Sequence, residues 1–119
     1  MSAITIAGGG LAGSEAAFWL AAAGFEVELR EMRPAKSPPA HRTGELAELV
    51  CSNSLGADSV TSPAGILKQE LRMLGSLVMR CADHSRVPAG KALAVDRDIF
   101  AASVTRAIEQ CEKINLVRE

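Results

Sequence analysis

The strongest signal for the fold of this chain is the glycine-rich run Gly8-Gly9-Gly10-Leu11-Ala12-Gly13. It follows a short apolar run at residues 3–7, and an acidic residue, Glu31, comes eighteen residues after Gly13. Between them lie an apolar segment of helical length and a second short run that ends at Arg30. A strand, a glycine-rich turn, a helix, a strand and an acid, in this order, form the fingerprint of a Rossmann βαβ unit that binds a dinucleotide.

Each part of this fingerprint has a separate physical task. Gly8 makes the tight turn, Gly10 lets the backbone approach a pyrophosphate, and Gly13 brings the helix close to the strand. The helix N-terminus offers free N–H groups to phosphates, and Glu31 would accept hydrogen bonds from a ribose. A glycine-rich turn that only packs two strands is the alternative, and it leaves Glu31 unexplained. The predicted cofactor-binding residues are Gly8, Gly9, Gly10, Leu11, Ala12, Gly13 and Glu31.

Length and composition indicate that the chain is one domain or part of one. The chain has 119 residues, of which 48% are hydrophobic, enough to supply a core. A net charge of −1 gives no overall attraction to nucleic acid or to an anionic membrane. The first basic residue is Arg30, so the N-terminus lacks the basic region of a secretory signal. The apolar run at residues 16–25 is too short to span a bilayer. We expect a cytoplasmic protein that does not enter a membrane.

Hydrophobic periodicity and turn residues predict the remaining elements. Residues 33–65 hold four of the five prolines and are expected to form a long irregular segment. Such a segment is too long to be passive in a compact domain, so we look there for chemistry. The expected elements are helices at 11–23 and 64–80, a helix after Asp96 that buries Phe100, Val104, Ile108 and Cys111, and strands at 26–30 and from 114 onward. Residues 92–95 are expected to be a short extended run.

The expected fold class is α/β, the N-terminal half of a doubly wound, Rossmann-like domain. Right-handed crossovers place the parallel strands in the order 3-2-1, with helices and a long insertion after the second strand. The first strand is apolar on both faces, as in the middle of a parallel sheet. A free apolar edge on that strand would invite aggregation. We therefore expect that residues 1–119 are the N-terminal part of a longer domain and are truncated, or that a partner covers this edge.

The cysteines predict no metal centre and no disulfide framework, because Cys51, Cys81 and Cys111 include no CxxC pair. Cys51 lies among small polar residues in the irregular segment. It is either a thiolate nucleophile, activated by a nearby cation, or a buried, inert cysteine of the common kind. From the residues alone the inert interpretation is favoured for all three. Candidate cations for Cys51 are Lys36, His41 and Arg42.

Two further groups of residues are predicted to be structural. The basic run is expected to be a solvated surface rather than a phosphate or RNA contact; it comprises Arg30, Arg33, Lys36, His41 and Arg42. The aromatic residues occupy core-like positions, so no base-stacking platform is expected; they are Phe18, Trp19, Phe25 and Phe100.

Four segments together carry a more specific signal: residues 6–17, Glu31-Met32-Arg33-Pro34, Glu48-Leu49-Val50-Cys51-Ser52-Asn53-Ser54-Leu55, and Ala92-Leu93-Ala94-Val95-Asp96-Arg97. They resemble the N-terminal part of the folate- and FAD-dependent tRNA (uracil-5-)-methyltransferases, and the similarity covers nearly the whole chain. The Glu-Met-Arg-Pro and Cys-Ser-Asn-Ser segments are more specific than the glycine motif, which many flavoproteins share.

The resemblance implies a particular reaction. Such enzymes bind FAD, reduce it with NADH or NADPH, and transfer a methylene from 5,10-methylenetetrahydrofolate to C5 of a T-loop uridine in tRNA. The cofactor carries the carbon and reduces it to a methyl group, giving 5-methyluridine. C5 of uracil becomes a good nucleophile when a thiolate adds to C6. Cys51 matches the first of the family's two functional cysteines, either as this thiolate or as an aid to the flavin chemistry and proton transfers.

The resemblance also limits what these residues do alone. The family's second cysteine, the rest of its FAD site and its nicotinamide and tRNA surfaces correspond to protein beyond residue 119, so the isolated chain is expected to be inactive. Two alternatives stay open. One is a generic FAD- or NAD(P)-dependent oxidoreductase in which Cys51 is structural. The other is a non-catalytic nucleotide-binding module, should the native chain end at Glu119.

Overall fold

The computed structural model describes residues 3–119, and its main sheet has three parallel strands. The strands are β1 (Ile4–Ala7), β2 (Val27–Glu31) and β6 (Ile114–Arg118), in the order β1-β2-β6. Val27 pairs with Ile4 on one side and with Ile114 on the other. The predicted α/β class and the predicted 3-2-1 order are confirmed, because β6 is the third parallel strand along the chain.

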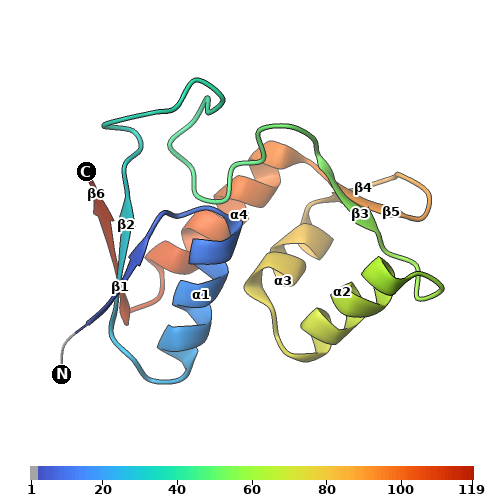
Figure 1. The fold of residues 1–119 in the computed structure, drawn as a ribbon, viewed down its shortest axis with the longest axis horizontal. Helices are drawn as coiled ribbons and strands as arrows, with labels where there is room; N and C mark the ends of the chain where they lie inside the picture. The colour runs from blue at the N-terminus through green and yellow to red at the C-terminus, as the bar shows by residue number, and fades with distance from the viewer. Residues whose placement is uncertain (1–2) are drawn as a thin grey trace.

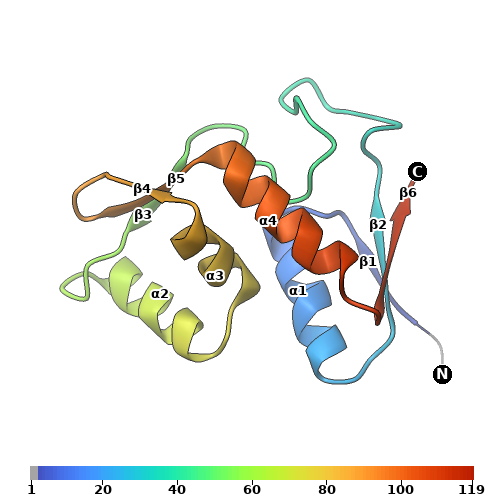
Figure 2. The same ribbon diagram turned by 180° about the vertical axis from the view of Figure 1, so that it is seen from behind.

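Two helices cover one face of this sheet. They are α1 (Leu11–Ala22) and α4 (Arg97–Glu109), and they lie on the same side of the sheet in both views (Figure 1, Figure 2). The chain leaves α1 through Gly24, whose φ of +95° is a backbone conformation that glycine adopts without strain. Asp96 caps α4 by accepting hydrogen bonds from the N–H groups of Asp98 and Ile99, both 3.0 Å long.

The opposite face of the sheet is uncovered in the described part of the chain (Figure 1, Figure 2). Because side chains alternate along a strand, this face carries Thr5, Glu28 and Asn115, which lie in register with one another, and Arg30 two residues after Glu28. Arg30 forms ion pairs there with Glu28 and Glu119. Among residues 3–119, β1 also pairs along one edge only.

A second, antiparallel sheet lies away from the first and was not predicted. Its strands are β3 (Ser54–Ala57), β4 (Arg86–Val87) and β5 (Ala92–Val95), in the order β3-β5-β4. The expectation that residues 33–65 are irregular throughout is therefore wrong at β3. Ser54 pairs with Ala94, forty residues further along the chain, and no local pattern reports such a pairing.

The helix expected at residues 64–80 is two helices, α2 (Pro63–Met73) and α3 (Leu77–His84). Ser62 caps α2 as the Ser-Pro pair suggests, accepting a hydrogen bond from the N–H of Gly65. The chain turns between them because Gly75 has a φ of +83° and Ser76 caps α3. No membrane-spanning candidate, that is, a helix long and apolar enough to cross a bilayer, occurs among residues 3–119.

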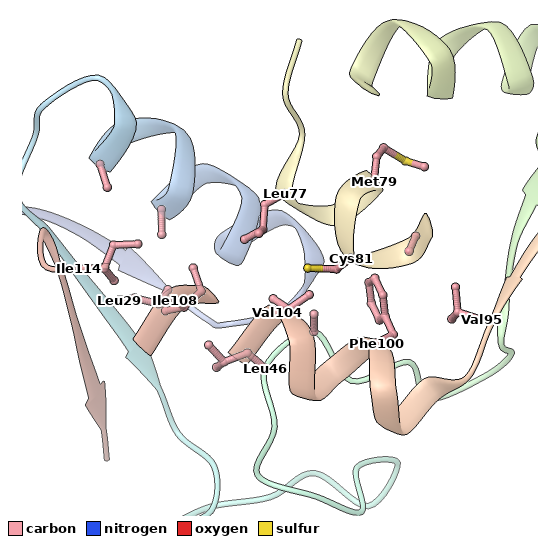
Figure 3. Close-up of a cluster of buried hydrophobic side chains, with 14 of the residues drawn as sticks. Leu29, Leu46, Leu77, Met79, Cys81, Val95, Phe100, Val104, Ile108 and Ile114 are labelled. Carbon is pink, nitrogen blue, oxygen red and sulfur yellow. The ribbon is translucent and has the colours of Figure 1, made fainter. Parts of the chain in front are cut away.

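The hydrophobic core extends from the main sheet, past α1 and α4, to α3 and β5 (Figure 3). The predicted buried face of α4 is confirmed at Phe100, Val104 and Ile108, each fully buried, while Cys111 is half-buried beyond the helix end. The prediction that the aromatic residues are core-like is wrong for two of them. Trp19 and Phe25 are 42% and 39% exposed.

Glu15 of α1 holds the N-terminus of α3. Its carboxylate accepts hydrogen bonds from the N–H groups of Val78 and Leu77, 2.7 and 3.2 Å long, and from the hydroxyl of Ser76 at 3.0 Å. The indole N–H of Trp19 donates to the same carboxylate at 2.6 Å. A carboxylate at a helix N-terminus satisfies free N–H groups and interacts favourably with the helix dipole. This contact joins the second half of the fold to α1.

Replacing Glu15 by alanine is expected to lower the free energy of unfolding by about 1–2 kcal/mol, since α3 loses its charged cap. Urea unfolding at neutral pH measures this change. The matched control is Glu109→Ala, which removes an exposed glutamate near the end of α4 and should alter stability little. Equal stability of the two variants would show that the cap contributes nothing.

Candidate functional site

The glycine-rich turn joins β1 to α1 at the carboxyl end of the sheet. Gly8 has a φ of +98° and donates a hydrogen bond to the carbonyl of Arg30 at 2.7 Å, which fixes the turn to β2. A Cβ atom added to Gly13 would lie 1.8 Å from the carbonyl oxygen of Gly8. A Cβ atom on Gly10 would meet nothing within 4 Å. Gly13 therefore lies in close backbone contact, and Gly10 faces open space.

The N-terminus of α1 presents unpaired N–H groups to this open space. The first helical hydrogen bond runs from the N–H of Ser14 to the carbonyl of Gly10 at 3.0 Å. The N–H groups of Leu11, Ala12 and Gly13 have no acceptor within residues 3–119. Such a helix start carries a partial positive charge and is suited to an anion.

Glu31 lies at the end of β2 beside the turn, and its carboxylate is buried. It accepts hydrogen bonds from the N–H of Gly9 at 2.9 Å and from the N–H and Nε of Arg33 at 2.9 and 2.7 Å. Burial alone would raise the pKa of this carboxyl, but these hydrogen bonds and the charge of Arg33 outweigh it and lower the pKa to about 2. Glu31 is therefore ionised at neutral pH.

A hollow of about 390 Å³ lies in front of the turn, lined by Ala7, Gly8, Gly10, Arg30, Glu31, Met32, Arg33, His41 and Glu119. His41 enters it from the long segment after β2. The Nδ1 atom of this imidazole is buried and has no hydrogen-bond partner among the described residues. A buried polar atom without a partner is costly and is a reason to expect a partner from outside the chain.

The long segment after β2 is anchored to the glycine-rich turn. Leu46 and Ala47 are fully buried, and the N–H of Ala47 donates to the carbonyl of Gly9 at 2.8 Å. Ala47 has a φ of +54°, which is uncommon for a residue other than glycine. Glu48 holds the part of the chain that precedes these two residues. Its carboxylate accepts hydrogen bonds from the N–H groups of Arg42 and Thr43. The segment arches over α1 and α4 in Figure 1.

Cys51 follows this anchor and is exposed. The prediction that it is a buried, inert cysteine is therefore wrong as to burial. Its thiol lines an open cleft of about 1760 Å³ together with Arg42 and Arg97. Arg42 was among the candidate cations, whereas His41 lines the other hollow and Lys36 lines neither.

The other two cysteines behave as structural residues. Cys81 is buried in α3, and this burial raises the pKa of its thiol. Cys111 is half-buried at the end of α4. No cluster of three or more His, Cys, Asp or Glu side chains suited to a metal ion is present between residues 3 and 119.

The prediction that the basic run is a solvated surface is wrong for one member, Arg33. This side chain is 3% exposed and forms an ion pair with Glu31 at 2.7 Å and a longer one with Glu48 at 3.7 Å. Its guanidinium thus joins the end of β2 to the long segment. The local signal for this role is Glu31, two residues earlier, which was predicted only to bind a ribose.

The whole chain is similar to known proteins. The family model described as glucose inhibited division protein A matches residues 3–119. The methylenetetrahydrofolate–tRNA-(uracil-5-)-methyltransferase TrmFO of Syntrophomonas wolfei is 55% identical over 119 residues, and that of Moorella thermoacetica is 60% identical over 116 residues. These matches cover 100% and 98% of the chain but only 27% and 26% of the relatives. The resemblance drawn from the four segments is confirmed, and the chain spans about a quarter of the length of these relatives.

A solved structure shows the same fold. GidA of Aquifex aeolicus superimposes with a TM-score of 0.74 over 98% of this chain and 19% of its own length. At 18% sequence identity, this likeness supports the arrangement of helices and strands and nothing further.

Proposed function

The chain belongs to the glucose inhibited division protein A family, and we propose that it forms the FAD-binding part of a folate-dependent tRNA (uracil-5-)-methyltransferase. In this proposal the whole enzyme takes a methylene from 5,10-methylenetetrahydrofolate and delivers it to C5 of a T-loop uridine, with NADH or NADPH as the source of hydride. Its substrate is tRNA, which places the enzyme in the cytoplasm.

The observation that carries the proposal is the hollow where Gly10, the start of α1 and Glu31 meet. Gly10 leaves room for a ligand, and the N–H groups of residues 11–13 suit a pyrophosphate. An ionised carboxylate has about four lone-pair sites. Because Glu31 receives three hydrogen bonds from the protein, it keeps acceptor capacity for a ribose hydroxyl. The unpartnered Nδ1 of His41 is a further polar contact for the ligand. The residues present fit the adenosine half of FAD.

FAD, when bound, supplies hydride and carries the one-carbon unit. The residues of this chain hold and orient it. Gly8, Gly9 and Gly10 shape the turn, Leu11, Ala12 and Gly13 donate their N–H groups, and Glu31 fixes the ribose. The ion pair between Arg33 and Glu31 keeps that carboxylate charged and in place.

Cys51 acts on the uridine. Its thiolate forms a bond to C6, and the electrons of the C5=C6 double bond move to the O4 oxygen, so that C5 becomes nucleophilic. After the new carbon is bonded to C5, loss of the C5 proton and of the thiolate restores the double bond. The exposure of Cys51 in a large cleft that Arg42 and Arg97 also line supports this role, because tRNA is large and anionic.

Residues 1–119 are the first part of the nucleotide-binding domain in this proposal. The rest of that domain, or a partner, pairs with the free edge of β1 and covers the open face of the main sheet. The share of the relatives' length that the chain spans supports this arrangement.

The test uses the full-length protein. Its absorption spectrum as isolated should show flavin bands, and mass spectrometry of the released nucleotide should identify FAD. Cys51→Ala should retain FAD and lose folate-dependent tRNA methylation by at least about a hundredfold, because removal of a nucleophile costs at least this much. Cys111→Ala is the matched control and should retain both properties.

Two other results would replace the proposal. Flavin reduction by NADH or NADPH without folate-dependent methylation, or methylation unaffected by Cys51→Ala, would favour a generic oxidoreductase in which Cys51 is structural. A full-length protein that binds no flavin would favour a non-catalytic module.

A further inference from the structure

The segment that carries Cys51 is held at both of its ends. At the near end, Leu46 and Ala47 lie against the glycine-rich turn and α4. At the far end, Asn53 is bonded to Val95 of β5, through its own carbonyl at 2.9 Å and its side-chain amide at 3.2 Å. Cys51 therefore lies in a short stretch whose place is set by two anchors on separate parts of the fold.

The near anchor has two backbone hydrogen bonds, and one of them is to a hydroxyl group of α4. The N–H of Leu46 donates to Oγ1 of Thr105 at 2.8 Å, and this hydroxyl donates in turn to the carbonyl of Ala101 at 2.8 Å. Thr105 is 6% exposed and Leu46 is fully buried, so the Leu46 N–H has no access to solvent that could replace Thr105. The next N–H along the chain, that of Ala47, is bonded to the carbonyl of Gly9.

We propose that Thr105 is a positioning residue for Cys51, acting through Leu46 and Ala47. The inference rests on the proposed function, since it supposes that Cys51 reacts with the tRNA base while FAD lies at the glycine-rich turn. The Thr105 hydroxyl, together with the bond from Ala47 to Gly9, then holds the reacting thiol at a fixed distance from the nucleotide-binding turn. Thr105 touches neither substrate nor cofactor in this role.

The strength of one hydrogen bond sets the size of the effect expected when the Thr105 hydroxyl is removed. Valine has the shape of threonine but cannot hydrogen-bond, so Thr105→Val leaves the Leu46 N–H buried and unpaired. The segment then moves to satisfy this group, and Cys51 moves with it. Serine keeps the hydroxyl and restores the bond. The losses should be about tenfold, the size expected from one hydrogen bond of ordinary net strength.

The experiment compares Thr105→Val, Thr105→Ser and a control, Ser103→Ala, in the full-length enzyme. Ser103 lies on the same helix, and its hydroxyl makes no bond to residues 42–53. Three quantities are measured: FAD content, kcat and KM for tRNA methylation, and amide hydrogen exchange at Leu46 and Ala47. Thr105→Val should keep FAD and KM, lose about tenfold in kcat, and exchange the Leu46 amide about tenfold faster. The other two variants should match the parent.

The outcomes separate this inference from the proposed function. Parent-like kcat in Thr105→Val, failure of Thr105→Ser to restore it, or loss of FAD in Thr105→Val would each overturn the positioning role. A parent enzyme without folate-dependent methylation would overturn the proposed function alone. In that case hydrogen exchange still tests whether Thr105 holds the segment in place. Unchanged protection of the Leu46 and Ala47 amides in Thr105→Val would show that it does not.

Discussion

Replacing Gly13 by alanine is expected to lower the free energy of unfolding by about 3 kcal/mol. The added Cβ atom would lie 1.8 Å from the carbonyl oxygen of Gly8. That oxygen belongs to the backbone of the turn and cannot rotate away, as the end of a flexible side chain could. The first turn of α1 must therefore move away from the loop, which disturbs packing at the carboxyl end of the sheet. Urea unfolding of the two proteins measures the loss.

The matched control is Gly10→Ala, three residues earlier in the same motif. Gly10 has a φ of −75°, which alanine adopts readily, and its Cβ would meet no atom within 4 Å. Stability should fall by less than about 1 kcal/mol, the cost of a poorer N-cap. Flavin retention in the full-length protein should nevertheless fall, because the methyl group would occupy the open space that we propose for the pyrophosphate. A Gly13→Ala protein as stable as the parent would show that the close contact is not required.

The first half of the fold was predictable because its signals are local. The apolar run before Gly8, the glycines themselves and the spacing to Glu31 specify a strand, a turn and a helix within one short stretch of chain. The helical spacing of Phe100, Val104 and Ile108 likewise predicted a face that is buried. In each case the residues that carry the signal also make the contact.

The predictions from the sequence were wrong where a local pattern of apolar residues does not correspond to contacts in the folded chain. Leu67 and Leu74 continue an apolar helical spacing across residues 64–80, yet they are 57% and 63% exposed. Spacing alone therefore suggested one long helix, and the Gly75-Ser76 pair was the better signal. The pairing of β3 with β5 depends on residues far apart in the chain, and nothing local predicts it.

In the candidate site, too, features with a local signal could be predicted and features that depend on distant residues could not. Glu31 could be predicted from its distance to the glycine motif. The burial of Arg33 could not, because it depends on Glu48, which the fold brings from fifteen residues away. The support of the Cys51 segment depends on Thr105, which lies on a helix much further along the chain. Residues that orient other residues leave little trace in a single sequence, because their partners are known only after folding.

Replacing Arg33 by methionine is expected to lower the free energy of unfolding at pH 7 by about 3–5 kcal/mol, the usual cost of removing one partner of a buried ion pair. Methionine keeps an apolar side chain of similar length but leaves the Glu31 carboxylate with only two backbone N–H donors. Thermal or urea unfolding measures the loss. Displacement of Glu31 would also weaken flavin retention in the full-length protein.

The pH dependence of this loss identifies its cause. In the parent the pKa of Glu31 is about 2, below the ordinary value of 4.5. The ionised carboxylate therefore stabilises the fold above pH 4.5, by about 3 kcal/mol at about 1.4 kcal/mol per pKa unit, and this contribution is lost as the pH falls toward 2. Without Arg33, burial raises the pKa of Glu31 and the contribution shrinks. The stability gap between parent and variant should thus fall by about half between pH 7 and pH 3.

The same substitution at a neighbouring arginine separates this effect from a general change of charge. Arg30 lies on β2 next to Glu31, is exposed, and forms surface ion pairs with Glu28 and Glu119. Arg30→Met should leave the free energy of unfolding nearly unchanged at both pH values, because water and salt screen such pairs. A gap for Arg33→Met that stays constant with pH would mean that Arg33 acts by packing rather than by holding the charge of Glu31. A gap that narrows on acidification would show that the ion pair with Arg33 holds the charge of the Glu31 carboxylate.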